Sequence, residues 1–232
     1  MEFIEVVPTA DNAPWLLRPP ADRRLTVAEA RERLARLPPP GRIDGFPNVR
    51  SPQPAALFIP LGDLDGEAAL AATKRPGTML RHRNHWVFPG GRLDAGVDAS
   101  TREAAVREAS EELGFPPAEV SLVGQLATRG PISTGFVLDV FVGLVDFAHL
   151  APDPHEVADC AVVPVSALAA GYHETFKLPE LEVGPLADGV VLTLDRPRER
   201  PLRFFEVRAG EYLWGLQGEI LHELLCALLP AQ

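Results

Sequence analysis

The sequence predicts an α/β fold, more closely an α+β arrangement around a mixed sheet, because short apolar strand-like segments alternate with helical ones. The 232 residues are enough for one large domain, and apolar residues, at 46%, can supply its core. The 23% of charged residues is close to the globular average, which argues against a wholly disordered chain. No window approaches the roughly 20 apolar residues of a spanning helix, so we expect no membrane partner.

Residues 1–54 are predicted to form an N-terminal extension with one short helix and a Pro-rich loop. Thr26 and Glu29 have the spacing of a capping box, which predicts a helix that ends near Leu37, before three prolines and a glycine. The extension has too few apolar residues to bury a core alone. We therefore expect it to pack on a main domain that comprises residues 55–232.

The main domain is predicted to begin with a strand over residues 55–61 and a hairpin partner over 68–73. A helix is predicted from about residue 100 to 113, because Gly114 and two prolines follow it. The remaining predicted elements are strands at 120–128, 136–147, 157–165, 190–194 and 202–207, a short helix at 166–170, a loop-like stretch at 171–189 and a C-terminal helix at 213–229.

Charge and cysteine content predict the class of partner, the state of the thiols and the location of the protein. The net charge is −10, from 22 basic and 32 acidic residues, whereas nucleic-acid binders usually present a basic face, so we expect no nucleic-acid partner. Cys160 and Cys226 lie far apart in apolar runs and are predicted to be buried free thiols. The first residues are acidic where a secretory signal would be basic, so we expect a cytoplasmic location.

Three carboxylates dominate the predicted helix. Glu108, Glu111 and Glu112 are spaced by three and four residues, which places them on one helix face. Like charges repel there, whereas clustered carboxylate oxygens are what Mg²⁺ or Mn²⁺ requires. A solvated acidic helix face is the alternative interpretation. Four apolar residues occupy another face and can pack on a sheet: Ala104, Ala105, Ala109 and Leu113.

Two further features favour a metal site. Arg107 stands four residues from both Glu103 and Glu111, so we expect it to pair with both and to orient the ligands. The segment Phe88-Pro89-Gly90-Gly91 precedes the helix, and the carbonyl of Gly91 can approach a cation closely because no Cβ intervenes.

This segment resembles the Nudix box, G-x5-E-x7-R-E-U-x-E-E-x-G-U with U apolar. Residues 107–115 match its second half at every defined position, but Gly91 and Arg107 are 16 residues apart where the pattern has 14. Val97 stands where the first Glu of the box belongs, and either Asp98 or Glu103 is a candidate replacement. The resemblance implies an α/β/α sandwich and a Mg²⁺- or Mn²⁺-dependent hydrolase of phosphorus-containing acid anhydrides.

The resemblance also implies roles for individual residues. Glu108 and Glu112 would be direct metal ligands, and the carbonyl of Gly91 would complete the shell. Glu111 would be a third ligand or the general base, and these two roles stay open. Arg107 would support catalysis by orienting the carboxylates. Glu156 is either a late ligand or base, as in some Nudix enzymes, or simply the start of a strand.

More of the chain resembles the coenzyme A diphosphatase-like branch of the family, whose motif before the box is L-L-T-x-R-S-x3-R-x3-G-x3-F-P-G-G. Thr73, Arg75 and residues 88–91 match it, and residues 213–221 resemble the closing W-G-x-T-x-x-I-L helix of the branch. The motif positions for Ser, Arg and Gly hold other residues, namely Pro76, Leu80 and Asn84.

The branch implies a small-molecule nucleotide as the substrate. Arg75, Arg81 and Arg83 are candidate contacts for a diphosphate or a 3′-phosphate. Coenzyme A or acyl-coenzyme A is the first candidate substrate, and ADP-ribose or a dinucleotide is the alternative. A non-catalytic nucleotide-sensing module is the rival function, and a homodimer is an open alternative.

Overall fold

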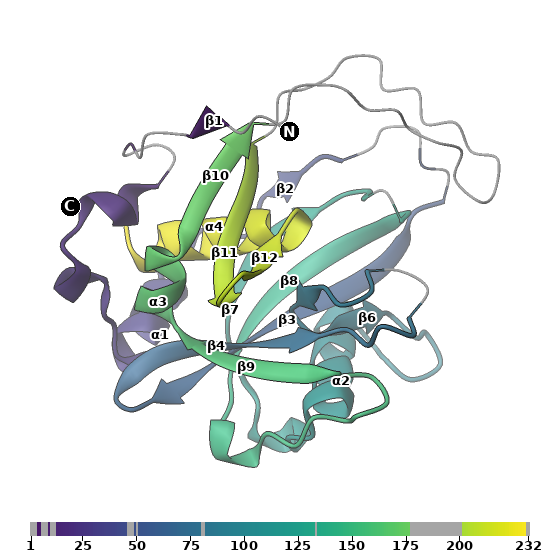
Figure 1. Cartoon of the computed structure of the whole chain (residues 1–232). Helices are drawn as coiled ribbons and strands as arrows, with labels where there is room; N and C mark the ends of the chain where they lie inside the picture. The colour runs from purple at the N-terminus through teal and green to yellow at the C-terminus, as the bar shows by residue number, and fades with distance from the viewer. Residues whose placement is uncertain are drawn as a thin grey trace.

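The computed structural model describes residues 4–5, 9, 13–45, 49, 51–79, 82–132, 134–176 and 201–230. A large sheet of mixed strand direction forms its centre, with helices on both faces (Figure 1). Its strand order is β2-β7-β8-β3-β4-β5, with β6 beside β3 and β9 beside β4. The β3–β8 and β2–β7 pairs are parallel and the others antiparallel, which confirms the predicted mixed sheet.

The strands of this sheet are β2 (Arg42–Ile43), β3 (Gln53–Leu64), β4 (Glu67–Lys74), β5 (Trp86–Val87), β6 (Gly90–Arg92), β7 (Ser121–Arg129), β8 (Phe136–Leu144) and β9 (Asp159–Pro164). The predicted β3–β4 hairpin is confirmed, with Leu61 opposite Leu70. The strands predicted at 120–128, 136–147 and 157–165 are present, although β8 ends at Leu144 and a short helical turn follows.

A second, antiparallel sheet has the order β1-β10-β11-β12, with β1 (Ile4–Glu5), β10 (Tyr172–Phe176), β11 (Pro201–Arg208) and β12 (Glu211–Trp214). It corrects two predictions. Residues 172–176 form a strand within the predicted loop, because they pair with β11. Leu213 and Trp214 belong to β12, because Leu213 pairs with Phe205, so the C-terminal helix starts only after Gly215. Residues 177–189 and the strand predicted at 190–194 lie outside the described residues.

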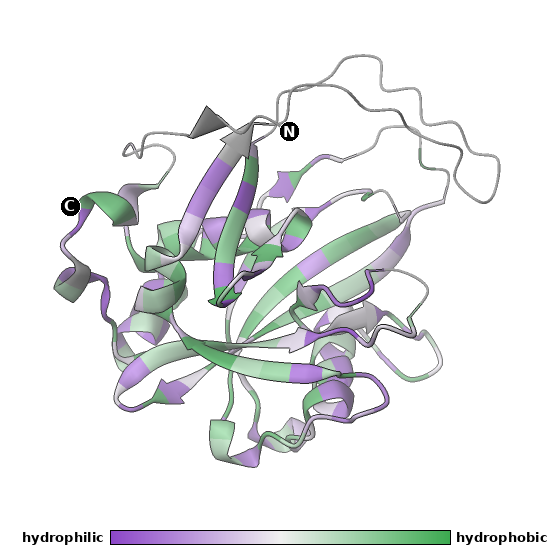
Figure 2. Ribbon diagram, in the orientation of Figure 1, coloured by the Kyte–Doolittle hydropathy of each residue, from purple (hydrophilic) through white to green (hydrophobic). Residues whose placement is uncertain are grey.

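The helices are α1 (Val27–Ala35), α2 (Thr101–Leu113), α3 (Val165–Ala170) and α4 (Leu216–Leu228), with 3-10 turns at Pro14–Leu17, Pro20–Arg23, Pro117–Glu119 and Phe147–His149. The apolar face of α2 packs on one side of the large sheet against Phe58 and Phe141. The other three helices share the core on the opposite side with Ile59 and Val140. Figure 2 shows that apolar residues, in green, predominate along the central strands of the large sheet. The layers are therefore α/β/α, as expected.

The N-terminal extension contributes to the main core. The capping box is confirmed: Thr26 Oγ1 accepts from the Glu29 N–H at 3.2 Å, and the Glu29 carboxylate accepts from the Thr26 N–H at 2.8 Å. Trp15 is fully buried, and its ring lies 5.2 Å from that of Tyr172. Burial of this kind stabilises both partners, while the division at residue 54 stays a prediction.

The position of α2 depends on contacts at both of its ends. Ser100 caps the first turn, and the Thr101 hydroxyl donates to Asp139 of β8 at 2.7 Å. Gly114 ends the helix in a left-handed conformation with φ 81°, and a Cβ there would overlap the backbone of Ala151. Glycine is needed for both reasons.

Two smaller predictions have mixed outcomes. Cys160 and Cys226 are free as predicted, but both are half-buried rather than buried, because each stands at the margin of a core cluster. Within the described residues, no helix is both long and apolar enough to span a membrane.

Candidate active site

Two of the three glutamates converge on the backbone of β6. Glu112 Oε1 accepts a long hydrogen bond from the Gly90 N–H at 3.4 Å, and its Oε2 accepts one from the Thr73 hydroxyl at 3.4 Å. The carboxylate of Glu108 lies directly over Gly91, where any Cβ would overlap it. Because α2 crosses β6 at this point, the glycine pair and the two carboxylates form one compact site.

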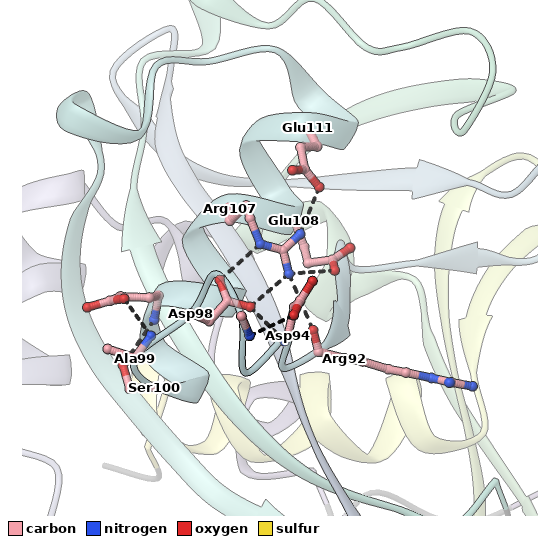
Figure 3. A network of polar contacts seen from close by, with 10 residues as sticks. Arg92, Asp94, Asp98, Ala99, Ser100, Arg107, Glu108 and Glu111 are labelled. Atoms are coloured by element: carbon pink, nitrogen blue, oxygen red, sulfur yellow. Dashed lines mark hydrogen bonds and ion pairs between the residues drawn. The ribbon is translucent and has the colours of Figure 1, made fainter.

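Arg107 is the centre of the polar network drawn in Figure 3. Its guanidinium donates to Glu108 at 3.0 Å, to Glu111 at 2.9 Å and to the carbonyl of Arg92 at 3.3 Å. Two more bonds, both 2.9 Å, reach the carboxylate of Asp98 in a bidentate pair. Such a pair holds a guanidinium in one orientation, and that orientation in turn directs Glu108 toward Gly91.

The expected pairing of Arg107 with Glu103 is corrected by the structure. Glu103 turns to the start of the helix, where its carboxylate accepts from the Ala99 N–H at 2.9 Å. Asp98 takes the bracing position instead, with a side chain only 2% exposed. The bonds from Arg107 lower the pKa of Asp98 below its ordinary value, so the pair is ionised at neutral pH. The longer loop before the helix places Asp98 there by folding back on Asp94, whose N–H donates to it.

Glu111 does not join the other two carboxylates. Its side chain is 55% exposed and pairs with Arg107 on the side of the guanidinium away from Asp98 (Figure 3). Within the described ranges, no three His, Cys, Asp or Glu side chains come close enough together to form a preformed metal centre. Mg²⁺ commonly binds through one or two carboxylates together with substrate phosphates and water. Glu108 and Glu112 fit that mode of binding.

The electrostatics of the pair also fit a cation site. Burial raises the pKa of Glu112 to about 7, and the N–H of Gly90 and the charge of Arg75 oppose that rise only in part. Burial likewise raises the pKa of Glu108, against the opposing effect of Arg107. A desolvated carboxylate that lacks a full counter-charge is stabilised by a divalent cation.

A loop beside the site brings a fourth carboxylate. The N–H of Asp153 donates to the backbone carbonyl of Glu112 at 3.0 Å, and Asp153 then accepts from the N–H of Glu156 at 3.1 Å. The negative charge of Glu156 raises the pKa of both Glu108 and Glu112, which places its carboxylate within electrostatic reach of the site. Glu156 does not begin β9, which starts at Asp159, so the strand-start interpretation is wrong.

The predicted arginines have different positions. Arg75 is half-buried just after β4, where its charge lowers the pKa of Glu112, and its Nε has no hydrogen-bond partner among the described residues. Arg83 is exposed, and its Nε donates to the carbonyl of Met79 at 2.6 Å. Arg81 lies outside the described residues. The structure therefore brings Arg75 within electrostatic reach of Glu112, whereas Arg83 is exposed.

Contacts from the C-terminal segment reach the site from residues that sequence analysis did not select. Gln217 of α4 accepts from the N–H of Phe88 at 3.2 Å, and Glu211 of β12 accepts from the indole N–H of Trp86 at 2.6 Å. More than 100 residues separate these partners in the chain. No local pattern signals such contacts, since helix periodicity reports neighbours three and four residues apart.

Comparison with known proteins now decides the family. The model for the NUDIX domain matches residues 51–182, which is more than half of the chain. This chain belongs to the Nudix family. It is a Nudix hydrolase, an enzyme of the pyrophosphatase class, as the carboxylate helix predicts.

Two relatives in sequence support this assignment. The chain is 31% identical over 190 residues to an uncharacterized Nudix hydrolase NudL of Photorhabdus laumondii, covering 81% of this chain and 88% of that protein. It is 29% identical over 177 residues to the NudL of Pectobacterium atrosepticum, covering 76% and 83%. Among solved structures, a MutT/nudix family protein from Enterococcus faecalis aligns with a TM-score of 0.46 and 12% identity over 95% of this chain and 74% of that one.

Proposed function

We propose that this Nudix hydrolase is a Mg²⁺- or Mn²⁺-dependent diphosphohydrolase that cleaves a nucleoside diphosphate linked to another group. One observation carries the proposal: Glu108 and Glu112 meet on the Gly90–Gly91 backbone with desolvated carboxyl groups. Nucleotide diphosphates carry dense negative charge, so their cleavage requires a site that can gather positive charge among these carboxylates.

Each residue has a separate task in this proposal. When bound, a divalent cation supplies charge neutralisation at the phosphoryl oxygens and lowers the pKa of water. Glu108 and Glu112 hold the cation, with the carbonyl of Gly91 as a further ligand. Arg107 keeps the Glu108 carboxylate aimed at β6. Glu111 is exposed enough to accept a proton from water as the general base, and Glu156 is the alternative base from the neighbouring loop.

Coenzyme A or acyl-coenzyme A is the substrate that we propose first. The motif before the box matches the coenzyme A branch in part, and the charge of Arg75 lowers the pKa of Glu112, which supports a role for Arg75 in binding the diphosphate. Arg83 and Arg81 stand farther along the same segment and are assigned to the 3′-phosphate. ADP-ribose and dinucleotides share the diphosphate but lack that phosphate, so they are the alternative substrates. The cytoplasmic location and the homodimer stay predictions.

A substrate panel tests the proposal directly. Coenzyme A, dephospho-coenzyme A, ADP-ribose and a dinucleotide are incubated with the enzyme and Mg²⁺ or Mn²⁺, and products are identified by mass. We expect coenzyme A to yield 3′,5′-ADP and 4′-phosphopantetheine only when the cation is present. Hydrolysis of ADP-ribose alone would refute the coenzyme A assignment and leave the diphosphohydrolase intact. Absence of turnover on every substrate would instead favour the nucleotide-sensing module.

A further inference from the structure

The C-terminal segment lies beyond the NUDIX-model match, yet it contacts the strand that leads into the active site. We propose that Glu211 and Gln217 are positioning residues, which hold residues 86–91 so that Gly90 and Gly91 meet the two carboxylates. The inference rests on the proposed function, because it concerns the same site. It adds a requirement for a segment that the family model does not include.

Residues 86–91 are called the lead-in. Gln217 contacts the backbone of the lead-in. Its side-chain oxygen accepts from the N–H of Phe88, a residue only 2% exposed that stands two positions before Gly90. The acceptor is itself held in place, because the start of α4 packs closely on β11: a Cβ on Gly218 would overlap the carbonyl of Arg203. A buried N–H without a partner is costly, so Phe88 is drawn to this acceptor.

Glu211 contacts both β4 and β5. Its carboxylate accepts from the Lys74 ammonium at 2.7 Å and from the Trp86 indole at 2.6 Å, and these two residues are register partners in the β4–β5 pair. Lys74 directly follows Thr73, whose hydroxyl donates to Glu112. One carboxylate from β12 thus fixes both the strand that supports Glu112 and the strand that leads to Gly90.

Arg208 and Asp159 add contacts to the same β4–β5 pair. Arg208 of β11 lies over the ring of Trp86, with its guanidinium carbon 5.4 Å from the ring centroid. It also pairs with Asp159, the register partner of Lys74 in the β4–β9 pair. Arg208 of β11, Glu211 of β12 and Gln217 of α4 therefore all contact residues 86–88 of the large sheet.

The chain offers a matched control within the same helix. Glu223 of α4 accepts from the Ala127 N–H at 2.9 Å and pairs with Arg129, so it ties the C-terminal segment to β7 instead. Gln217→Met and Glu211→Leu remove contacts to the lead-in, whereas Glu223→Gln weakens a contact of the same kind elsewhere. Gln217→Glu restores an acceptor oxygen and serves as the rescue variant.

The test measures Mn²⁺ affinity by calorimetry, kcat and KM on the hydrolysed substrate, and hydrogen exchange of the amides in residues 87–91. We expect Gln217→Met and Glu211→Leu each to weaken Mn²⁺ binding and to lower kcat by about 10-fold, short of the 10²-fold cost of a misplacement of about 1 Å. Amide exchange at residues 87–91 should rise, with KM little changed. Gln217→Glu should recover most of the loss, and Glu223→Gln should stay within about twofold of the wild type.

The outcomes distinguish failure of the positioning role from failure of the proposed hydrolase function. Full Mn²⁺ affinity and kcat in both lead-in variants would overturn the positioning role and leave the hydrolase standing. Equal losses in Glu223→Gln would also overturn it, because docking of the segment would then matter only for stability. A wild-type enzyme that binds Mn²⁺ and hydrolyses no diphosphate would refute the proposed function, while affinity and exchange would still report on the lead-in.

Discussion

The helix α2 and the segment from Arg75 to His85 both carry clustered charges, but their arginines make different contacts. On α2, Arg107 is held by four groups, and its neighbours are fixed by helix geometry. In the segment from Arg75 to His85, Arg75 is half-buried and its charge lowers the pKa of Glu112, whereas Arg83 is exposed and donates to the nearby carbonyl of Met79. Local spacing therefore located the helix and its Arg107–Glu111 pair, but it did not settle which carboxylates gather at the site or which one braces Arg107.

The two segments also differ in how their charges are compensated. Asp98 is almost fully buried and forms a bidentate ion pair with Arg107, so its charge is compensated within the fold. Glu108 and Glu112 carry raised pKa values because burial is not matched by positive charge. The first arrangement needs no ligand, whereas the second is the one to which we assign the cation in our proposal.

The largest effect is expected from the two inward carboxylates. Glu108→Gln and Glu112→Gln keep the side-chain size but remove a ligand charge, so turnover should fall by about 10²-fold or more, on the order of 3 kcal/mol. Initial rates at saturating cation measure this, with circular dichroism to confirm the fold. Glu103→Gln lies on the same helix away from the site and should act as wild type. Near-normal rates in both site variants would rule out the metal assignment.

The pH dependence of the cation-free protein should reveal Glu112. Its pKa in the folded state is about 7, above the ordinary 4.5, so the folded protein binds the proton more tightly than the unfolded chain. The associated stability is fully present below pH 4.5 and is lost as pH rises through 7, up to about 3 kcal/mol. Urea unfolding in EDTA across this range measures the loss. Glu112→Gln should flatten the profile; parallel profiles would show that the carboxyl is not so buried.

The ion pair of Asp98 with Arg107 should stabilise the fold even without a cation. Asp98→Asn leaves the guanidinium with a weaker partner and should cost about 2 kcal/mol, which lowers Tm by roughly 4–8 °C. Because the pKa of Asp98 is lowered in the fold, its contribution is present at neutral pH and is lost as pH falls through that low pKa. The Tm difference from wild type should therefore shrink in acid. A constant difference at all pH values would mean that shape, not charge, is responsible.

The glycine pair separates stability from cation binding. A Cβ at Gly90 would overlap the backbone of Ala56, so Gly90→Ala should destabilise the fold by about 1–3 kcal/mol. The three atoms nearest to a Cβ at Gly91 all belong to the side-chain carboxylate of Glu108 rather than to backbone, so Gly91→Ala should fold almost normally in EDTA. Thermal melts with and without Mn²⁺ compare them, and Gly91→Ala should lose most of the cation-induced rise in Tm. An undiminished rise would place the cation away from Glu108.

The smallest effect is expected in the loop arginines, and it tests the substrate. Arg75→Met should lower kcat/KM by about 10-fold on coenzyme A and dephospho-coenzyme A alike, since both carry the diphosphate. Arg83→Met should lower kcat/KM by a similar factor on coenzyme A only, since its proposed contact is the 3′-phosphate. Steady-state kinetics on the two substrates distinguish the roles. If neither variant discriminates between the two substrates, the 3′-phosphate is bound by Arg81 or by no arginine of this segment.

Sequence reasoning recovered the elements whose signals are short-range. The boundaries of α2 follow from Ser100 and Gly114, and the capping box of α1 from Thr26 and Glu29. The two misplaced elements both belong to the second sheet. β10 has no strong alternation of its own, and the apolar residues of β12 continue the period of the helix that follows, so only pairing with β11 defines them as strands.

By itself, the sequence determined the carboxylate helix, the order of Arg107 and its glutamates, and the alternation of strands and helices, because these depend on neighbours a few residues apart. Tertiary structure alone decided that Asp98 rather than Glu103 braces Arg107, that Glu112 is buried while Glu111 is exposed, and that Gln217 reaches Phe88. Desolvation and long-range hydrogen bonds depend on which distant segments pack together. That information is absent from any local pattern and appears only when the sheet and its flanking helices are assembled.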